Sequence, residues 1–204
     1  ELVITDDDVD TLKGSRSRLS VGARLTRQET LLLALMSSEN RAAHALGRNY
    51  PGGIPAFVAA MNRKAQELGM TNTHYQNAAG LPAEGHYTTA RDLATLARAV
   101  IYKHPQHYPL YAEKEFKYNN IRQPNRNRLL FLDPTVDGLK TGHTDEAGYC
   151  LVASSKRENT RLIAVVLGTK SDNARASETQ KLLAYGFRYF ETVDLYKAAT
   201  EVTR

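Results

Sequence analysis

Apolar positions in the first half of the chain recur with the spacing of amphipathic helices. Thr26 and Glu29 form a capping box ahead of an apolar run, so a buried helix is expected over residues 30–36, stopping near Ser37-Ser38. A second helix is predicted from about Asn40 to Arg48, because a Pro-Gly-Gly turn follows it closely. The two helices are therefore expected to meet at a sharp break.

Two longer helices follow. Pro55 suits a helical first turn and Gly69 closes that segment. Between them, apolar residues recur at helical spacing: Phe57, Val58, Met61, Ala65 and Leu68. Another helix, capped by Thr88 or Thr89, is predicted to run to Lys103. Residues 1–25 show neither the helical nor the strand spacing of apolar residues, and they are expected to be polar and irregular.

In the second half of the chain, the residue pattern becomes typical of β-strands. A short strand is predicted over residues 116–118, and longer ones over 136–141, 148–155 and 161–168, with Glu158-Asn159 as a hairpin turn between the last two. Ser171 or Asp172 then opens a long helix whose expected inner stripe is Leu182, Leu183, Gly186 or Phe187, and Phe190. This order predicts an α+β domain in which helices pack against an antiparallel sheet.

Composition narrows the class of protein. The chain has 204 residues, of which 42% are hydrophobic, as expected for one folded domain. The formal net charge is +5, but basic residues occur in small separate groups without interleaved aromatic residues, so nucleic acid is not an expected partner. The longest apolar run, residues 31–36, is too short for a membrane-spanning helix.

Neither the cysteine nor the histidines predict a metal site. Cys150 is the single cysteine, which excludes an intrachain disulfide, and it is expected to be a small buried core residue. The six histidines include no His-Glu-x-x-His element, and Pro105 separates His104 from His107. No metal or other cofactor is therefore expected.

Two tripeptides carry candidate chemistry. Ser38-Glu39-Asn40 lies at the predicted break between two helices, and Lys140-Thr141-Gly142 ends a predicted strand. Each alone has an ordinary explanation, since the first could be a helix N-cap and the second a surface lysine. Together they match the Ser-x-Asn and Lys-Thr-Gly elements that accompany a Ser-x-x-Lys nucleophile in penicillin-binding proteins and serine β-lactamases.

Longer stretches make the resemblance specific. Residues 136–149, Val-Asp-Gly-Leu-Lys-Thr-Gly-His-Thr-Asp-Glu-Ala-Gly-Tyr, resemble the third-motif region of low-molecular-mass penicillin-binding proteins, the D-alanyl-D-alanine carboxypeptidases. Four further segments resemble the same family: residues 121–127, 68–74, 89–93 and 185–190. Residues 36–43 are similar to the DD-endopeptidase branch, whereas the chain after about residue 110 is closer to the carboxypeptidases. The resemblance implies a β-lactamase/transpeptidase-like fold.

The resemblance also implies roles for individual residues. Ser38 would relay a proton to the leaving amine, and Asn40 would bind the substrate amide. Lys140 would supply positive charge near the scissile bond, the Thr141 hydroxyl would contact the terminal carboxylate, and Gly142 would let the strand approach the substrate closely. The backbone N–H of His143 would form half of the oxyanion site.

Two arginines match family positions at or near the cleft. Arg126 lies within Asn125-Arg126-Asn127, and Arg175 lies near the start of the last predicted helix. A guanidinium can bind both oxygens of a carboxylate, which favours a role in holding the substrate. The competing explanation is an ordinary surface ion pair for each.

The nucleophile that the resemblance requires is not found in this sequence. No serine has a lysine three positions later, so the chain is expected to be a partial catalytic domain over residues 1–192, lacking the N-terminal Ser-x-x-Lys segment as a partner. Residues 193–204 are expected to be a linker or the start of a second, β-rich domain. Any association with a membrane would depend on residues beyond the C-terminus.

The function implied is that of a serine peptidase. It would remove the terminal D-Ala from peptidoglycan stem peptides, or cleave D-Ala cross-links, through an acyl-enzyme, and β-lactams would inhibit it. The protein is expected to be exported to the periplasm, its signal peptide being absent from this chain. A serine β-lactamase and a catalytically inactive peptidoglycan-binding module are the alternatives.

Overall fold

A three-stranded antiparallel sheet forms the centre of the second half of the chain. The computed structural model describes residues 1–11, 17–193 and 195–196. In the sheet, β6 (Gly148–Arg157) lies between β5 (Val136–Thr144) and β7 (Thr160–Thr169). The β6–β7 turn falls at Glu158, as predicted, where the backbone is left-handed.

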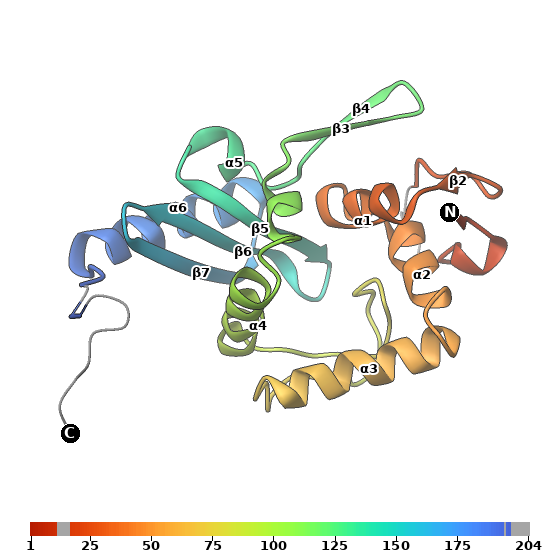
Figure 1. Cartoon of the computed structure of the whole chain (residues 1–204), viewed down its shortest axis with the longest axis horizontal. Helices are drawn as coiled ribbons and strands as arrows, with labels where there is room; N and C mark the ends of the chain where they lie inside the picture. The colour runs from red at the N-terminus through yellow and green to blue at the C-terminus, as the bar shows by residue number, and fades with distance from the viewer. Residues whose placement is uncertain (12–16, 194, 197–204) are drawn as a thin grey trace.

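Helices cover both faces of this sheet. α6 (Asp172–Tyr189) lies on one face and α4 (Ala90–Lys103) on the other (Figure 1). Side chains alternate between the faces, so Leu151 packs in the core beneath α6, whereas its neighbour Val152 packs against the residues of α4. The sheet is therefore the middle layer of an α+β sandwich, as the sequence pattern predicts.

The first third of the chain forms a separate helical group. It contains α1 (Arg27–Met36), α2 (Asn40–Arg48) and α3 (Gly53–Glu67), with α3 lying along the margin of the molecule (Figure 1). Thr26 and Glu29 bond each other's backbone N–H groups, at 3.1 Å and 2.7 Å, so the predicted capping box starts α1. Thr89 caps α4 in a similar way, with its hydroxyl accepting from the N–H of Asp92.

The N-terminal segment is more ordered than its polar pattern predicts. β1 (Leu2–Val3) pairs with β2 (Arg24–Leu25), and the short 3₁₀ helix η1 (Asp6–Asp8) follows β1. Apolar side chains from this segment are buried against α1 and α2: Ile4, Leu19 and Leu25. The expectation of irregular structure over residues 1–25 was therefore wrong for the part that closes this small core, because pairing with distant residues buries its few apolar side chains.

A hairpin and two short helices connect the halves. The 3₁₀ helix η2 (Tyr108–Ala112) precedes β3 (Glu115–Tyr118), which pairs with β4 (Ile121–Pro124) in a projecting hairpin (Figure 1). α5 (Leu129–Leu132) then leads into β5. The sequence pattern predicted β3 but not β4 or α5.

Two predictions about burial were wrong. In α6, Leu183 is buried but Leu182 is 48% exposed, and Phe190, the extended residue just after the helix, is 62% exposed. The helix instead turns Thr179, Leu183 and Gly186 towards the sheet, which places Leu182 about 100° away from that face. Cys150 is only partly buried, and its thiol donates to the carbonyl of Ala147 at 3.4 Å.

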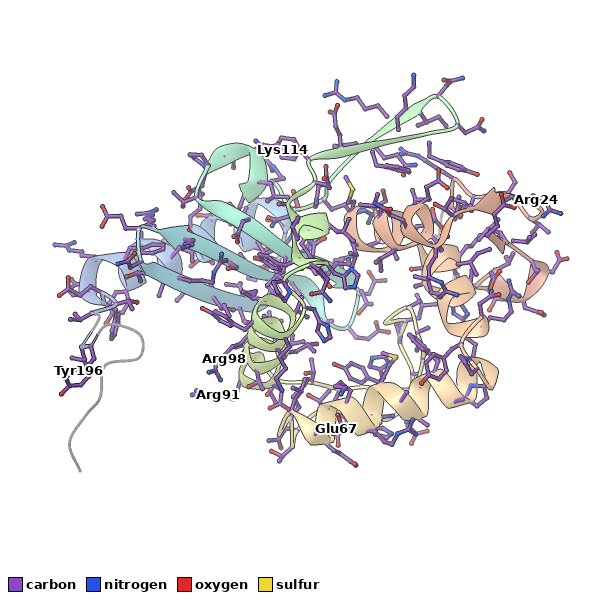
Figure 2. The ribbon with its side chains drawn as sticks, viewed as in Figure 1. Arg24, Glu67, Arg91, Arg98, Lys114 and Tyr196 are labelled. Carbon is purple, nitrogen blue, oxygen red and sulfur yellow. The ribbon has the colours of Figure 1, made fainter. Side chains whose placement is uncertain are left out.

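Charged side chains are dispersed over the surface. Arg24, Glu67, Arg91 and Arg98 project from three separate parts of the fold (Figure 2). Over the described residues, no helix has the length and apolar character needed to cross a membrane. The predicted linker or second domain lies largely outside the described residues, since 194 and 197–204 are not among them.

Candidate active site

The break between α1 and α2 brings Ser38 to the sheet. Ser38 has a left-handed backbone, with φ of 53°, an uncommon conformation for a residue other than glycine. Its hydroxyl accepts a hydrogen bond from Nζ of Lys140, which lies 102 residues later on β5. Lys140 also donates to the carbonyl oxygen of Thr141 at 2.7 Å. The two tripeptides singled out in the sequence thus meet in space.

The loop after β4 braces this junction. The backbone N–H of Arg126 donates to the carbonyl of Met36 at 3.1 Å, at the C-terminal end of α1. The Ser37 hydroxyl donates to the side-chain oxygen of Gln123 at 2.9 Å. The two contacts hold β4 and the loop after it against the break that carries Ser38.

The surroundings of Lys140 lower the pKa of its ammonium group to about 7. Desolvation by the protein is the largest cause, and repulsion from Arg126 and then Arg175 adds to it. At neutral pH the group therefore exchanges readily between the charged and neutral forms. Such a group can bind an anion in one form and accept a proton in the other.

Asn40 opens α2 beside Ser38. Its side-chain amide donates to Oδ2 of Asp10 at 3.2 Å, so a segment near the N-terminus orients it. The predicted contact with a substrate amide stays a prediction.

The remainder of the Lys-Thr-Gly element, with His143 after it, lies within β5. Thr141 is buried, whereas Gly142 and His143 are exposed, and the His143 ring stacks on Tyr149 with centroids 3.9 Å apart. A Cβ added at Gly142 would lie 3.9 Å from Cβ of Cys150, which is ordinary van der Waals contact. Glycine at this position is therefore not required by packing within the chain.

The two predicted arginines differ in their surroundings. Arg175 is 7% exposed, pairs with Asp172, and donates to the carbonyls of Gly142 at 3.2 Å and Cys150 at 3.5 Å. Its guanidinium thus clamps β5 and β6 at the candidate site. Arg126 is exposed, and its guanidinium has no hydrogen-bond partner within the described part of the chain. Of the two, Arg126 is the one with donors available for an anion.

Sequence reasoning missed several residues that build the site. Asn127 is 1% exposed and donates to the carbonyl of Gly138 on β5 at 3.0 Å, which ties the loop of Arg126 to the strand of Lys140. Glu39, between Ser38 and Asn40, is a buried carboxylate. A glutamate inside an otherwise functional tripeptide was the signal that could have identified it.

The described residues contain no group of three or more histidine, cysteine, aspartate or glutamate side chains suited to a metal ion. The candidate site consists instead of hydroxyl, amide and cationic groups. These groups can bind a carboxylate, transfer a proton and stabilise negative charge, which are the requirements of acyl transfer at a serine.

The fold and the site define a class of protein, the penicillin-binding serine peptidases of transpeptidase-like fold. The sequence model of the D-alanyl-D-alanine carboxypeptidase family matches residues 3–171. The chain belongs to this family, and the predicted fold class is confirmed.

Relatives of both predicted branches are similar to the chain. D-alanyl-D-alanine carboxypeptidase DacC of Escherichia coli is 49% identical over 83% of the chain and 43% of its own length. A D-alanyl-D-alanine endopeptidase of Pseudomonas aeruginosa is 40% identical over 81% of the chain and 55% of its own length. The crystal structure of penicillin-binding protein 5 from Haemophilus influenzae superposes with a TM-score of 0.92 at 36% identity, covering 99% of the chain and 60% of that structure. The chain thus spans about half the length of the curated relatives it matches.

Proposed function

We propose that this chain is the greater part of the catalytic domain of a serine D-alanyl-D-alanine peptidase that acts on peptidoglycan stem peptides. The observation that carries the proposal is the Lys140 ammonium against the Ser38 hydroxyl, at the meeting point of β5 and the α1–α2 break. The pKa of Lys140 near 7 supports it, because proton transfer is most efficient when the pKa lies near the working pH.

In the proposed reaction, a serine hydroxyl adds to the carbonyl carbon of the D-Ala–D-Ala amide and loses its proton. The C–N bond then breaks, and Ser38 passes a proton to the leaving amine while Lys140 stabilises charge beside it. Water hydrolyses the resulting ester and releases the shortened peptide. The nucleophile would come from a Ser-x-x-Lys segment of the full-length protein, since no such element occurs in these 204 residues.

Substrate binding is proposed to use β5 and the arginine beside it. An extended peptide would lie along the exposed part of β5 at Gly142, with the N–H of His143 as one oxyanion donor. The terminal carboxylate would be bound by Lys140, by the Thr141 hydroxyl and by the guanidinium of Arg126. Asn40 would hold the peptide amide. Arg175, already bonded to Gly142, would support the strand.

The remaining proposals concern the whole protein. Residues 1–192 would be the greater part of the catalytic domain, and 193–204 a linker or the start of a β-rich domain. The protein would act in the periplasm or cell wall, and β-lactams would acylate it. The chain is similar to both carboxypeptidases and an endopeptidase. The proposed chemistry therefore applies equally to removal of a terminal D-Ala and to cleavage of a D-Ala cross-link.

Labelled penicillin tests the proposal directly. The full-length protein should form a stable covalent adduct on the serine of an upstream Ser-x-x-Lys segment, located by mass spectrometry. The 204-residue chain alone should form no adduct. A full-length protein that is not acylated would contradict the peptidase proposal and favour a wall-binding module, whereas rapid turnover of the penicillin would favour a β-lactamase. An adduct on Ser38 would show that its assignment as a proton relay is wrong.

Two substrates separate the forms of the peptidase. A free pentapeptide reports carboxypeptidase activity, and a cross-linked muropeptide dimer reports endopeptidase activity. The full-length protein should release D-Ala from the first, or resolve the second into monomers, and the lack of both reactions would exclude the peptidase proposal.

A further inference from the structure

Glu39 is a buried carboxylate inside the candidate site. It lies between Ser38 and Asn40 and is 6% exposed. Oε2 accepts the backbone N–H of Arg18 at 3.2 Å, while Oε1 is buried without a hydrogen-bond partner in the described part of the chain. Carboxylates are seldom buried without a compensating cation, because desolvation of the charge is costly.

A cation without a direct partner belongs to a segment that adjoins that of this carboxylate. The backbone of Arg126 bonds to Met36, three residues before Glu39, so the two side chains start from adjoining segments. Among the described residues, no carboxylate forms an ion pair with the Arg126 guanidinium. The Arg126 side chain is exposed, so packing does not confine it to one position.

The other influences on Arg126 are unfavourable to its charge. Desolvation lowers the pKa of the guanidinium, and repulsion from Arg175 and Arg18 lowers it further. Attraction to Glu39 is the influence that raises it. Lys140 is also close enough for Arg126 to depress the lysine's pKa. A guanidinium charge in this position is therefore unfavourable unless an anion compensates for the repulsion.

We propose that Glu39 is a positioning residue that holds the Arg126 guanidinium beside Lys140, and that recognition of a free substrate carboxylate depends on it. The inference rests on the proposed function, because it assigns Arg126 to the terminal carboxylate. Glu39 itself does not touch the substrate. Its buried charge keeps Arg126 near the position where the substrate carboxylate binds, without a direct ion pair that would occupy the guanidinium.

Steady-state kinetics of Glu39→Gln in the full-length protein test the inference. Glutamine retains an oxygen that can accept the Arg18 N–H but removes the charge. We expect KM for a D-Ala–D-Ala peptide with a free carboxylate to rise about threefold or more, on the scale of a surface ion pair, with kcat little changed. KM for the matched peptide with a C-terminal carboxamide should not change.

A double-mutant cycle separates positioning from a structural role. Arg126→Gln should raise KM for the carboxylate peptide at least as much, and the double variant should be no worse than Arg126→Gln alone, because both changes remove the same interaction. Fully additive effects would overturn the inference. So would an equal loss of kcat on both peptides, which is the result expected if Glu39 only supports the Ser38 turn.

Two controls keep the outcomes distinct. A wild-type protein that is inactive, or that does not prefer the carboxylate peptide, would contradict the proposed function rather than the role of Glu39. If Glu39→Gln does not fold, as judged by its melting temperature, Glu39→Asp serves instead. Aspartate keeps the negative charge but moves it away from Arg126 by the length of one methylene group. KM for the carboxylate peptide should therefore rise by a smaller factor than the one expected for Glu39→Gln. An identical change for both peptides would contradict the inference.

Discussion

Ser38 shows how the backbone of one residue prepares a chemical group. Its left-handed conformation ends α1 and starts α2 within a few residues, and it turns the hydroxyl out towards Lys140. Non-glycine residues adopt this conformation at an energetic cost, and they are found at functional sites as well as in turns such as the one at Glu158. The strained backbone of Ser38 therefore serves the candidate site by presenting the hydroxyl to Lys140.

At the residue scale, Lys140→Ala should impair acylation. Removing the ammonium takes away the charge beside Ser38 and the candidate carboxylate site, so the rate of penicillin acylation of the full-length protein should fall about 10²-fold or more. Stopped-flow or gel-based acylation measures it. Lys156→Ala, an exposed lysine in the same sheet, is the matched control and should acylate at the wild-type rate. An unchanged rate for Lys140→Ala would remove this residue from the mechanism.

At the element scale, the loop from β4 to α5 connects the two halves of the chain. Asn127 donates to Gly138 on β5 and accepts from the N–H of Leu129 at 3.2 Å, and Asn125 accepts from the N–H of Asn127 at 2.9 Å. These side chains are buried in a polar network that fixes β5 relative to the α1–α2 break. The loop thus sets the distance between Lys140 and Ser38, although neither residue belongs to it.

Asn127→Ala should destabilise this connection. The change leaves the buried carbonyl of Gly138 without the Asn127 donor, which costs about 1–3 kcal/mol in the free energy of unfolding. Urea denaturation of wild type and variant measures the difference. Gln106→Ala removes an exposed amide and should change the stability by less than about 0.5 kcal/mol. A loss for Asn127→Ala no larger than that of the control would show that the network contributes little.

At the scale of the whole molecule, the site joins a helical group to a sheet sandwich and concentrates positive charge between them. Arg126, Lys140 and Arg175 come from the connecting loop, from β5 and from α6. Desolvation and then repulsion from the two arginines lower the pKa of Lys140, and both are costs that folding must overcome. Charge at this site therefore links global stability to pH.

The lowered pKa of Lys140 sets the sign of this linkage. The unfolded chain retains the proton up to the ordinary value of 10.5, whereas the folded chain releases it near 7, so the unfolded state binds more protons between these values. The contribution of Lys140 to the free energy of unfolding should therefore rise from pH 7 towards pH 10, by at most about 1.4 kcal/mol per pH unit. Denaturation of wild type and Lys140→Met over pH 6.5–9.5 isolates this contribution. A difference between the two proteins that is independent of pH would contradict a lowered pKa.

Local signals in the sequence were sufficient to predict most of the helices and strands. The Thr26–Glu29 capping box, the Thr89 cap and the alternation in β5, β6 and β7 act over a few neighbouring residues, so they can be read from the chain alone. The same is true of Ser38 and Lys140, because each lies in a tripeptide whose composition points to the chemistry. Their meeting in space came from the resemblance and not from spacing.

Only the tertiary structure decided what depends on distant partners. The burial of Ile4 and Leu19, the exposure of Leu182 and the partial burial of Cys150 depend on how one element rotates against another, which local periodicity does not specify. The electrostatic attraction between Glu39 and Arg126 likewise acts between segments that are remote in the chain. The residue types of the site were thus determined by the sequence itself, whereas burial, proton affinity and the positions of the charges were set by packing, because desolvation and Coulomb interactions depend on distances in three dimensions.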